Sequence, residues 1–306
     1  MLDIISFGAA TVDIFAKSDH FRVKDKNLFL EYSSKNEIDH SLICSGGGAT
    51  NSSTAFSRLG LNAALVSLLG FDSLSHIITQ ELFQNQVNSK LLVAKKDEST
   101  DFSIILVAPD GGRSILTHRG SSRLESADIS WEKIKKTKWF YITSLEGNLD
   151  LLEQLIGFAK ENNIKIALNP GNREISARKI LLPLLSQIDF LLLNRVESEA
   201  LTLADFGQTD YWPKLKKTGS QIIAVTNGRR GAHILTSDQN LFSPIINTTP
   251  VDETGAGDSF GSAFVAALCY DYSVKKALSW AIKNSASVVS FMGAKEGLLT
   301  LNKIKR

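Results

Sequence analysis

The sequence predicts an α/β protein in which helices cover both faces of a mainly parallel sheet, accompanied by a smaller β-structure. Three observations support this fold class. From about residue 130 onward, short apolar runs alternate with amphipathic helical patterns, which is typical of strand–helix–strand units. Two other segments, 28–44 and 100–117, break this alternation. The composition of the 306 residues is globular, with 43% hydrophobic and 22% charged side chains, so the chain can bury a full core.

The predicted strands are short, continuous apolar runs, as expected for strands that are buried on both faces. They span 3–7, 63–69, 138–142, 165–168, 188–193 and 221–225. The predicted helices span 50–59, 74–86, 149–161, 196–204, 255–269 and 273–291. Because no repeat, low-complexity tract or linker divides the chain, we expect one domain over residues 1–306.

The segment 100–117 predicts a β-hairpin, because SIILV and RSILT flank the turn Ala108-Pro109-Asp110-Gly111-Gly112. Neither this segment nor 28–44 is followed by a crossover helix. We therefore expect both to lie outside the main sheet and to pair with each other. Together they predict a lid formed by about residues 10–44 and 97–119.

Charge and cysteine content exclude several function classes. The 34 basic and 32 acidic side chains leave a net charge of +2, so there is no broad electrostatic footprint for nucleic acid or for a membrane surface. Cys44 and Cys269 lie far apart without metal-ligand spacing, which argues against disulfide scaffolds and zinc sites. No apolar run approaches the ~18 residues of a membrane span, and the start of the chain lacks a secretion signal. We expect a cytoplasmic protein.

Three predicted strands end in polar side chains. They finish at Asn169-Pro170, at Asn194 and at Thr226-Asn227-Gly228. Ligands of open parallel sheets bind beyond the carboxyl ends of the strands, so these residues are candidates for binding. The alternative is that each residue only caps a helix or starts a turn.

Asn194 stands three residues before Glu197, where a helix is expected to begin. An amide and a carboxylate at this spacing can jointly hold waters around Mg²⁺, a cation that keeps several of its waters. A helix N-cap with an acidic first turn would produce the same pattern.

A glycine-rich turn, Asp252-Glu253-Thr254-Gly255-Ala256-Gly257-Asp258, leads into the helix predicted over 255–269. Exposed N–H groups at a helix N-terminus bind anions, and the helix dipole strengthens that site. Asp258 would compete with a bound anion unless it acts on a neighbouring hydroxyl. We therefore expect Asp258 to orient a substrate hydroxyl and to accept its proton, while the N–H groups of Ala256, Gly257 and Asp258 meet the charge on a transferring phosphoryl group.

Other interpretations of this turn are weaker. The chain contains no GxxxxGK[ST] phosphate loop. Gly255, Gly257 and Gly261 have GxGxxxG spacing, but Pro250 interrupts the preceding strand and no acidic strand end follows about 20 residues on. A plain helix start with an aspartate cap remains an alternative. A second cluster, Ser45-Gly46-Gly47-Gly48-Ala49-Thr50-Asn51, would admit a small polar ligand next to the backbone, or would simply form a tight turn.

At these two clusters the sequence resembles the ribokinase-like, or PfkB, family of carbohydrate kinases. The motifs are GGGATNSSTAFSRLG at 46–60 and DETGAGDSF at 252–260. The resemblance extends over nearly the whole chain, through GAATVD at 8–13, GFD at 70–72, the predicted lid hairpin, LNP at 168–170, NRVESEA at 194–200, TNGRRGA at 226–232 and GA at 293–294. It implies a ribokinase-like three-layer sandwich with a small β-sheet lid.

The resemblance also implies roles for individual residues. Asp258 resembles the catalytic base, and the backbone of Gly255, Ala256 and Gly257 resembles the anion hole for the ATP γ-phosphate. The remaining implied roles are Mg²⁺ organised by Asn194 and Glu197; nucleotide binding by Asn194, Thr226, Gly228 and Gly231; sugar-hydroxyl binding by Asp13, Gly46, Gly47, Asn51 and Glu146; and a monovalent cation, K⁺, held by oxygens of Asp252, Thr254 and the chain near Val288 and Gly293.

The chain departs from the family pattern at two informative positions, and Arg119 is a further residue that bears on the substrate. Glu253 adds a charge where the usual signature reads DTxGAGD, and it either alters cation binding or faces solvent. Gly48 stands where ribokinases usually carry lysine, so ribose is not assured as the substrate. Arg119 follows the lid hairpin and is expected either to reach an anionic substituent of a substrate or to lie in a solvated loop.

Together these features predict an ATP- and Mg²⁺-dependent kinase that phosphorylates a primary hydroxyl of a free sugar, such as ribose or a ketose like fructose. A nucleoside kinase and a kinase of phosphorylated or acidic sugars are the substrate alternatives, and a catalytically idle sugar or nucleotide sensor is the non-enzyme alternative. The expected partners are ATP, the sugar and a second copy of the chain that pairs through the lid, because pairing would cover exposed strand edges.

Overall fold

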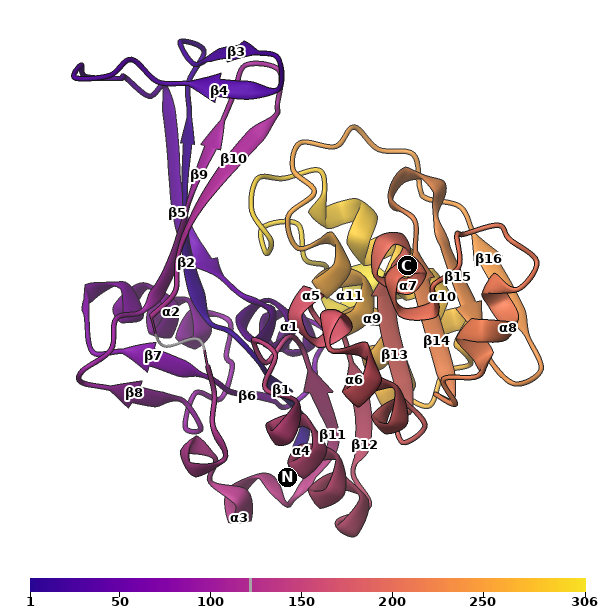
Figure 1. The fold of residues 1–306 in the computed structure, drawn as a ribbon. Helices are drawn as coiled ribbons and strands as arrows, with labels where there is room; N and C mark the ends of the chain where they lie inside the picture. The colour runs from indigo at the N-terminus through magenta and orange to yellow at the C-terminus, as the bar shows by residue number, and fades with distance from the viewer. Residues whose placement is uncertain (121–122) are drawn as a thin grey trace.

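The computed structural model describes residues 1–120 and 123–306, and its centre is an eight-stranded sheet (Figure 1). Six of its strands are parallel, and the last two in the chain are antiparallel and form one edge. From that edge inward the order is β16 (Asn240–Ser243), β15 (Ala232–Leu235), β14 (Ile222–Thr226), β13 (Phe190–Asn194), β12 (Lys165–Leu168), β11 (Thr137–Ile142), β1 (Leu2–Phe7) and β6 (Ala63–Val66).

Helices cover both faces of this sheet, which confirms the predicted three-layer α/β fold. Alternate strand residues enter opposite cores: Ile4 packs with the helices of one face and Ile5 with those of the other. The face of Ile4 carries α1 (Gly48–Arg58), α9 (Ala256–Cys269), α10 (Val274–Val288) and α11 (Leu301–Lys305). The face of Ile5 carries α4 (Leu149–Glu161), α6 (Arg178–Leu185), α7 (Arg195–Thr202) and α8 (Tyr211–Lys216), with α5 (Asn172–Ser176) and α3 (Trp131–Ile134) beside them.

A separate four-stranded sheet rises from the main body as the lid (Figure 1). Its order is β10 (Arg113–His118), β9 (Asp101–Val107), β2 (Thr11–Lys17) and β5 (His40–Gly46). The prediction that segments 28–44 and 100–117 pair with each other is wrong, because β2 lies between β5 and β9 and pairs with both. A short pair, β3 (Arg22–Lys24) and β4 (Asn27–Phe29), lies at the outer end of the lid.

The predicted hairpin of the lid is confirmed. β9 and β10 pair antiparallel from Phe102 opposite His118 to Val107 opposite Arg113. The turn closes through a 2.8 Å hydrogen bond from the Ala108 N–H to the Gly112 carbonyl. Gly111 has a φ of 82°, a left-handed conformation that glycine adopts without steric cost.

The structure differs from the sequence-based expectation in a few elements. The strand predicted over 63–69 divides at Ser67, whose hydroxyl donates to the Gly8 carbonyl at 2.6 Å. Its second part, β7 (Leu68–Gly70), leaves the central sheet and pairs with β8 (Val93–Lys95), beside α2 (Ser73–Gln84). Strand β15, the edge strand β16 and the helix α6, which contains Pro183, were not predicted. None of the described helices is long and apolar enough to cross a membrane.

Helix α9 approaches the sheet closely at Gly261, which is buried. A Cβ atom at this position would lie 2.2 Å from the Tyr141 Oη atom and 2.7 Å from a Leu192 methyl group. Real Cβ atoms do not approach other atoms so closely, so only glycine allows this approach. The approach matters for function, because the first turn of α9 carries the candidate site.

Gly261→Ala should therefore destabilise the fold by about 1–3 kcal/mol, despite the better helix propensity of alanine, because overpacking forces its neighbours to move. Urea unfolding measures the change. The matched control is Gly157→Ala in α4, where an added Cβ meets nothing within 4 Å and should leave stability unchanged or raise it. Equal stability changes in the two variants would contradict this packing argument.

Candidate active site

The first turn of α9 forms the centre of the candidate site. Gly255, at its N-cap, has a φ of 74°, and a Cβ there would lie 2.4 Å from the Cβ of Ala294. At Gly257 an added Cβ would meet nothing within 4 Å, so the backbone borders open space. The Ala256 N–H donates to the Glu253 carbonyl at 3.3 Å, while helix geometry leaves the N–H groups of Gly257 and Asp258 without intrahelical acceptors. The turn can therefore receive an anion.

Asp258 projects from this turn and accepts a 2.8 Å hydrogen bond from the Asn51 side-chain amide of α1, 207 residues away in the sequence. Burial raises the pKa of Asp258, and the Asp13 carboxylate also raises it. The Asn51 hydrogen bond and the positive charge of Lys295 act in the opposite direction. The site thus holds a carboxyl group whose proton affinity is increased by its surroundings, as suits a proton acceptor.

Lys295 is a buried cation that the sequence analysis did not single out. Its side chain is 6% exposed, its amino group donates to the Ser45 hydroxyl at 2.7 Å and to the Ser45 carbonyl, and it forms a 3.3 Å ion pair with Glu81. Burial lowers the pKa of Lys295, and the Glu81 carboxylate opposes this. Its charge lowers the pKa values of both Asp13 and Asp258. A lysine directly after a glycine–alanine pair gave no recognisable sequence signal.

The predicted sugar-binding residues Asp13, Gly46, Gly47 and Asn51 come together at the base of the lid. Asp13 is 8% exposed, and burial raises its pKa. A Cβ at Gly46 would lie 2.1 Å from an Asp13 carboxylate oxygen. Only glycine at position 46 therefore lets β5 pass Asp13 this closely. At Gly47, with a φ of 90°, a Cβ would lie 2.4 Å from the Ala9 carbonyl oxygen.

The two departures at the glycine motifs have structural explanations. A Cβ at Gly48 would lie 2.6 Å from the Thr143 hydroxyl, so the lysine usual at this position has no room here. Glu253 has a side chain that is 61% exposed and that pairs with Arg229 at 3.7 Å. Of the two expectations for Glu253, the structure supports the one in which it faces solvent.

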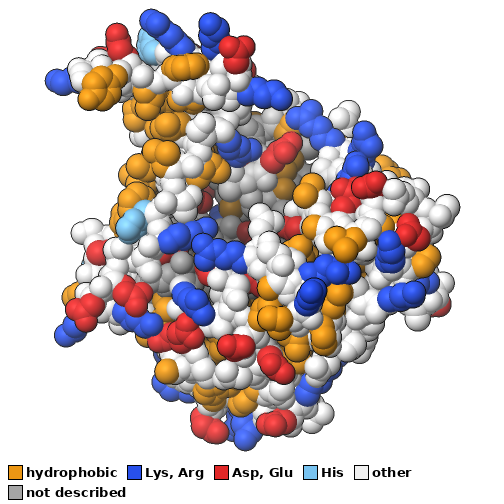
Figure 2. Space-filling model, viewed as in Figure 1, with side chains coloured by type: hydrophobic (Ala, Val, Ile, Leu, Met, Phe, Trp, Pro, Cys, Tyr) orange, Lys and Arg blue, Asp and Glu red, His pale blue; other side chains and the backbone are white. Residues whose placement is uncertain are grey.

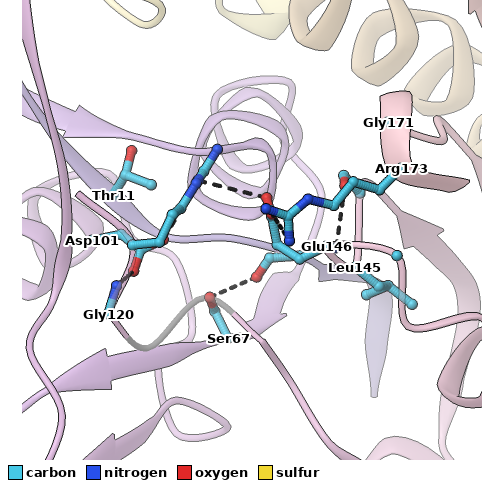
Figure 3. Close-up of polar contacts among 12 residues, drawn as sticks. Thr11, Ser67, Asp101, Gly120, Leu145, Glu146, Gly171 and Arg173 are labelled. Carbon is cyan, nitrogen blue, oxygen red and sulfur yellow. Dashed lines mark hydrogen bonds and ion pairs between the residues drawn. The ribbon is translucent and has the colours of Figure 1, made fainter. Parts of the chain in front are cut away.

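Glu146 lies between two arginines (Figure 3). Its carboxylate pairs with Arg119 at 3.6 Å and with Arg173 at 3.2 Å, and Arg119 also approaches Asp101 at 3.5 Å. The φ of Glu146 is 56°, a strained conformation for a residue with a side chain. Arg119 therefore lies against the carboxylates of Glu146 and Asp101 in this structure. The sequence analysis did not identify Arg173 as a partner of Glu146.

Glu174, another residue missed by the sequence analysis, holds the loop that carries Glu146. This carboxylate is 1% exposed and accepts hydrogen bonds from the N–H groups of Leu145, Gly147 and Gly171 at 2.8–2.9 Å, as well as from the Ser144 hydroxyl. Charge-assisted bonds of this kind are stronger than neutral ones. They fix the loop after β11 in its strained conformation.

A cavity of about 480 Å³ lies on the other side of the α9 turn. It brings together the nucleotide-binding candidates Asn194, Thr226, Gly228 and Gly231 with the backbone of Ala256 and Gly257. Unpredicted apolar residues complete its lining: Ile245, Ile246, Phe260, Ile282, Ala286 and Val289. Figure 2 shows that the molecule is hollowed between the lid and the main body.

Asn194 and Glu197 form a reciprocal helix cap at the start of α7. The Asn194 side chain accepts the Glu197 N–H at 2.9 Å, and Glu197 Oε2 accepts the Asn194 N–H at 2.7 Å. The predicted alternative, an N-cap, is thus present. Glu197 Oε1 has no hydrogen-bond partner within residues 1–120 and 123–306, so it can still accept a hydrogen bond from a metal-bound water, and the pair fits a hydrated Mg²⁺. No cluster of three or more His, Cys, Asp or Glu side chains suited to a metal occurs in those residues.

The residues expected to hold a monovalent cation are already engaged. Asp252 Oδ2 accepts the Gly293 N–H at 2.9 Å, and the Val288 carbonyl accepts the Phe291 N–H at 3.1 Å. Arg113 of the lid donates to Asp252 Oδ1 and to the Thr254 hydroxyl. The side-chain oxygens of this set therefore do not fit a monovalent cation in this structure.

Comparisons with known proteins agree with this geometry. Residues 1–301 match the model of the pfkB family carbohydrate kinases. The chain is 26% identical to ribokinase of Haemophilus influenzae over 265 residues, covering 84% of this chain and 85% of the relative. It is 26% identical to probable fructokinase-2 of Arabidopsis thaliana over 293 residues, covering 89% and 83%.

Solved structures show the same fold. An E. coli protein assigned as ribokinase II, solved with ATP and Mg²⁺, superposes with a TM-score of 0.85 at 19% identity, covering 100% of this chain and 98% of that chain. At 19% identity this likeness establishes only the fold. Membership of the family rests on the family model, which matches residues 1–301. The chain belongs to the pfkB family of carbohydrate kinases.

Proposed function

We propose that this carbohydrate kinase transfers the γ-phosphate of ATP to a primary hydroxyl of a free sugar, with ribose or a ketose such as fructose as the candidate, and that Asp258 is the base. The observation that carries the proposal is the pairing of Asp258 with Asn51 at an open helix N-terminus. The Asn51 Oδ1 atom is buried and has no hydrogen-bond partner among the described residues. A sugar hydroxyl would satisfy it, because an unpaired buried acceptor is costly.

In this mechanism Asp258 orients the hydroxyl and accepts its proton as the new oxygen–phosphorus bond forms. The bond between the γ-phosphorus and the β–γ bridging oxygen breaks, and ADP leaves with that oxygen. The N–H groups of Gly257 and Asp258 are placed to meet the charge on the transferring oxygens. Bound Mg²⁺ would neutralise phosphate charge, with Glu197 holding one of its waters.

A neutral sugar is supported by the charges around the sugar-binding residues. Arg119 and Arg173 lie against Glu146 and Asp101, so two positive charges meet two negative ones. Asp13, buried at the base of the lid, adds a further carboxylate, which faces the positive charge of Lys295. A phosphorylated or acidic sugar would have to displace these ion pairs, whereas hydroxyl groups would complement the carboxylates.

ATP is supported as the phosphoryl donor by the cavity beside α9. At Gly228 and Gly257 an added Cβ would meet nothing within 4 Å, so phosphate groups can approach the backbone. The apolar lining formed by Ile245, Ile282 and Val289 suits a flat base.

Use of ATP and two cysteines without a disulfide both support a cytoplasmic location.

ADP release from Mg-ATP tests this proposal across ribose, fructose, other ketoses, nucleosides, sugar phosphates and keto-sugar acids. We expect sustained turnover with one neutral sugar. Nucleotide binding without ADP release across the whole panel would instead favour a sensor, and turnover confined to a sugar phosphate or acid would contradict the neutral substrate.

Asp258→Asn should lower kcat by about 100-fold or more and leave the Kd for the nucleotide within a few-fold, since the amide cannot accept the proton. Steady-state kinetics with nucleotide titration measures both effects. Asp150→Asn, an exposed carboxylate in the first turn of α4 on the other face of the sheet, is the control and should retain near-normal kcat. A near-normal kcat for the asparagine variant would remove Asp258 from the mechanism.

Lys295→Met should move the acidic limb of the kcat/KM profile to higher pH. Loss of the positive charge favours the neutral, protonated carboxyl groups, so the pKa values of Asp258 and Asp13 rise and a higher pH is needed to ionise them. A pH–rate profile measures the shift. Lys303→Met in α11, an exposed lysine, is the control. An unchanged limb in a folded Lys295 variant would show that this charge does not act on the site.

We also propose that the protein forms a homodimer through the exposed apolar surface of the lid. It exposes large apolar side chains, including Ile43, Ile115 and Leu116, each 54–56% exposed, and Figure 2 shows apolar side chains gathered along its outer edge. A second copy would bury this surface. Light scattering after size exclusion should give twice the 33.5 kDa mass of the chain, and Leu116→Lys should yield the monomer. A monomeric parent protein at micromolar concentration would contradict the dimer.

A further inference from the structure

Arg113 connects the lid to the loop that precedes the anion-binding turn. It is the first residue of β10, and its guanidinium donates to Asp252 Oδ1 and, at 2.7 Å, to the Thr254 hydroxyl. These partners lie 139 and 141 residues further along the chain. Asp252 itself is only 6% exposed, so the carboxylate is shielded from water, whereas the Arg113 side chain is 30% exposed.

The Asp252 carboxylate receives four donors. Oδ1 accepts the Thr254 N–H at 2.9 Å, the Thr254 hydroxyl at 2.7 Å and Arg113, while Oδ2 accepts the Gly293 N–H at 2.9 Å. Burial acts to raise the pKa of Asp252, but these hydrogen bonds more than offset it and hold the pKa below its usual value. Oδ1 therefore has no lone pair left for a further cation while Arg113 is bound, whereas Oδ2 keeps one.

The position of this loop bears directly on the chemistry. Thr254 immediately precedes Gly255, and the N–H groups of Gly257 and Asp258 follow within the same turn. A displacement of the loop would therefore displace the donors that face the transferring phosphoryl group. Small displacements of such donors raise the activation barrier, because the donors stabilise the transition state only if they are already in position.

We propose that Arg113 takes the place of a bound monovalent cation in this kinase: when the lid lies over the cleft, its guanidinium neutralises Asp252 and positions the loop before the anion-binding turn. Arg113 is thus a positioning residue that couples lid closure to phosphoryl transfer. The inference rests on the proposed kinase function. It predicts an enzyme that is indifferent to K⁺, whose Arg113 variants become K⁺-dependent because the unpaired, buried carboxylate then attracts a free cation.

The test compares kcat and KM in K⁺, Na⁺ and tetramethylammonium salts, all at the same ionic strength of about 0.1 M so that screening is equal. The parent enzyme should give the same kcat in all three within about twofold. Arg113→Met should lose about tenfold or more in kcat in tetramethylammonium, a barrier increase of about 1.4 kcal/mol, and K⁺ should restore most of it. Arg113→Lys, which keeps the charge, should lie between the two. The matched control is Arg22→Ala in β3, an exposed lid arginine with no ion pair to the main body among the described residues.

Hydrogen exchange of the amides of residues 252–258 gives a second readout that needs no turnover. Exchange should quicken in Arg113→Met without K⁺ and slow when K⁺ is added, while the parent protein should not respond. A parent enzyme that K⁺ activates tenfold, or an Arg113→Met variant unchanged in both readouts, would overturn the inference. Absence of ADP release with every sugar in every salt would instead overturn the proposed function, and the exchange data would still decide the role of Arg113.

Discussion

The structure depends on keeping one carboxylate, Asp258, in the first turn of a helix that must also receive a negatively charged phosphate. Partial burial makes its ionised form costly, and the nearby Asp13 carboxylate adds to that cost. Two neighbours oppose these effects: the Asn51 amide by a direct hydrogen bond and the buried Lys295 by its charge. Asn51 comes from α1 and Lys295 from the segment after α10, so the packing of α1, α9 and α10 on one face of the sheet determines the protonation of the site.

Buried carboxylates also organise the loops around this centre. Glu174 gathers backbone N–H groups of the loop that carries Glu146, and Asp101 accepts the Gly120 N–H at 2.7 Å where the lid returns to the main body. Asp252 does the same for the loop before α9. Each charge–dipole cluster holds a segment without regular secondary structure in one conformation. The cleft is therefore built from loops that the lid and the main body jointly constrain.

The sequence indicated the central strands and long helices well, because continuous apolar runs and helical spacing reflect burial directly. It also located the two glycine-rich turns, where Gly46 and Gly255 allow approaches that a Cβ would prevent. It did not reveal β15, whose short apolar run is interrupted by His233, or the half-exposed edge strand β16. Nor could it reveal Lys295, Glu174 or the Arg113–Asp252 pair, because contacts between residues distant in sequence leave no local pattern.

A crystal structure with the unphosphorylated sugar substrate and a non-hydrolysable ATP analogue would test most directly whether Asp258 acts on a sugar hydroxyl. We expect the primary hydroxyl oxygen to lie within about 3 Å of an Asp258 carboxylate oxygen and in line with the terminal phosphate, which faces the N–H groups of Gly257 and Asp258. A sugar bound with its primary hydroxyl away from Asp258, or a terminal phosphate outside the α9 turn, would contradict this mechanism.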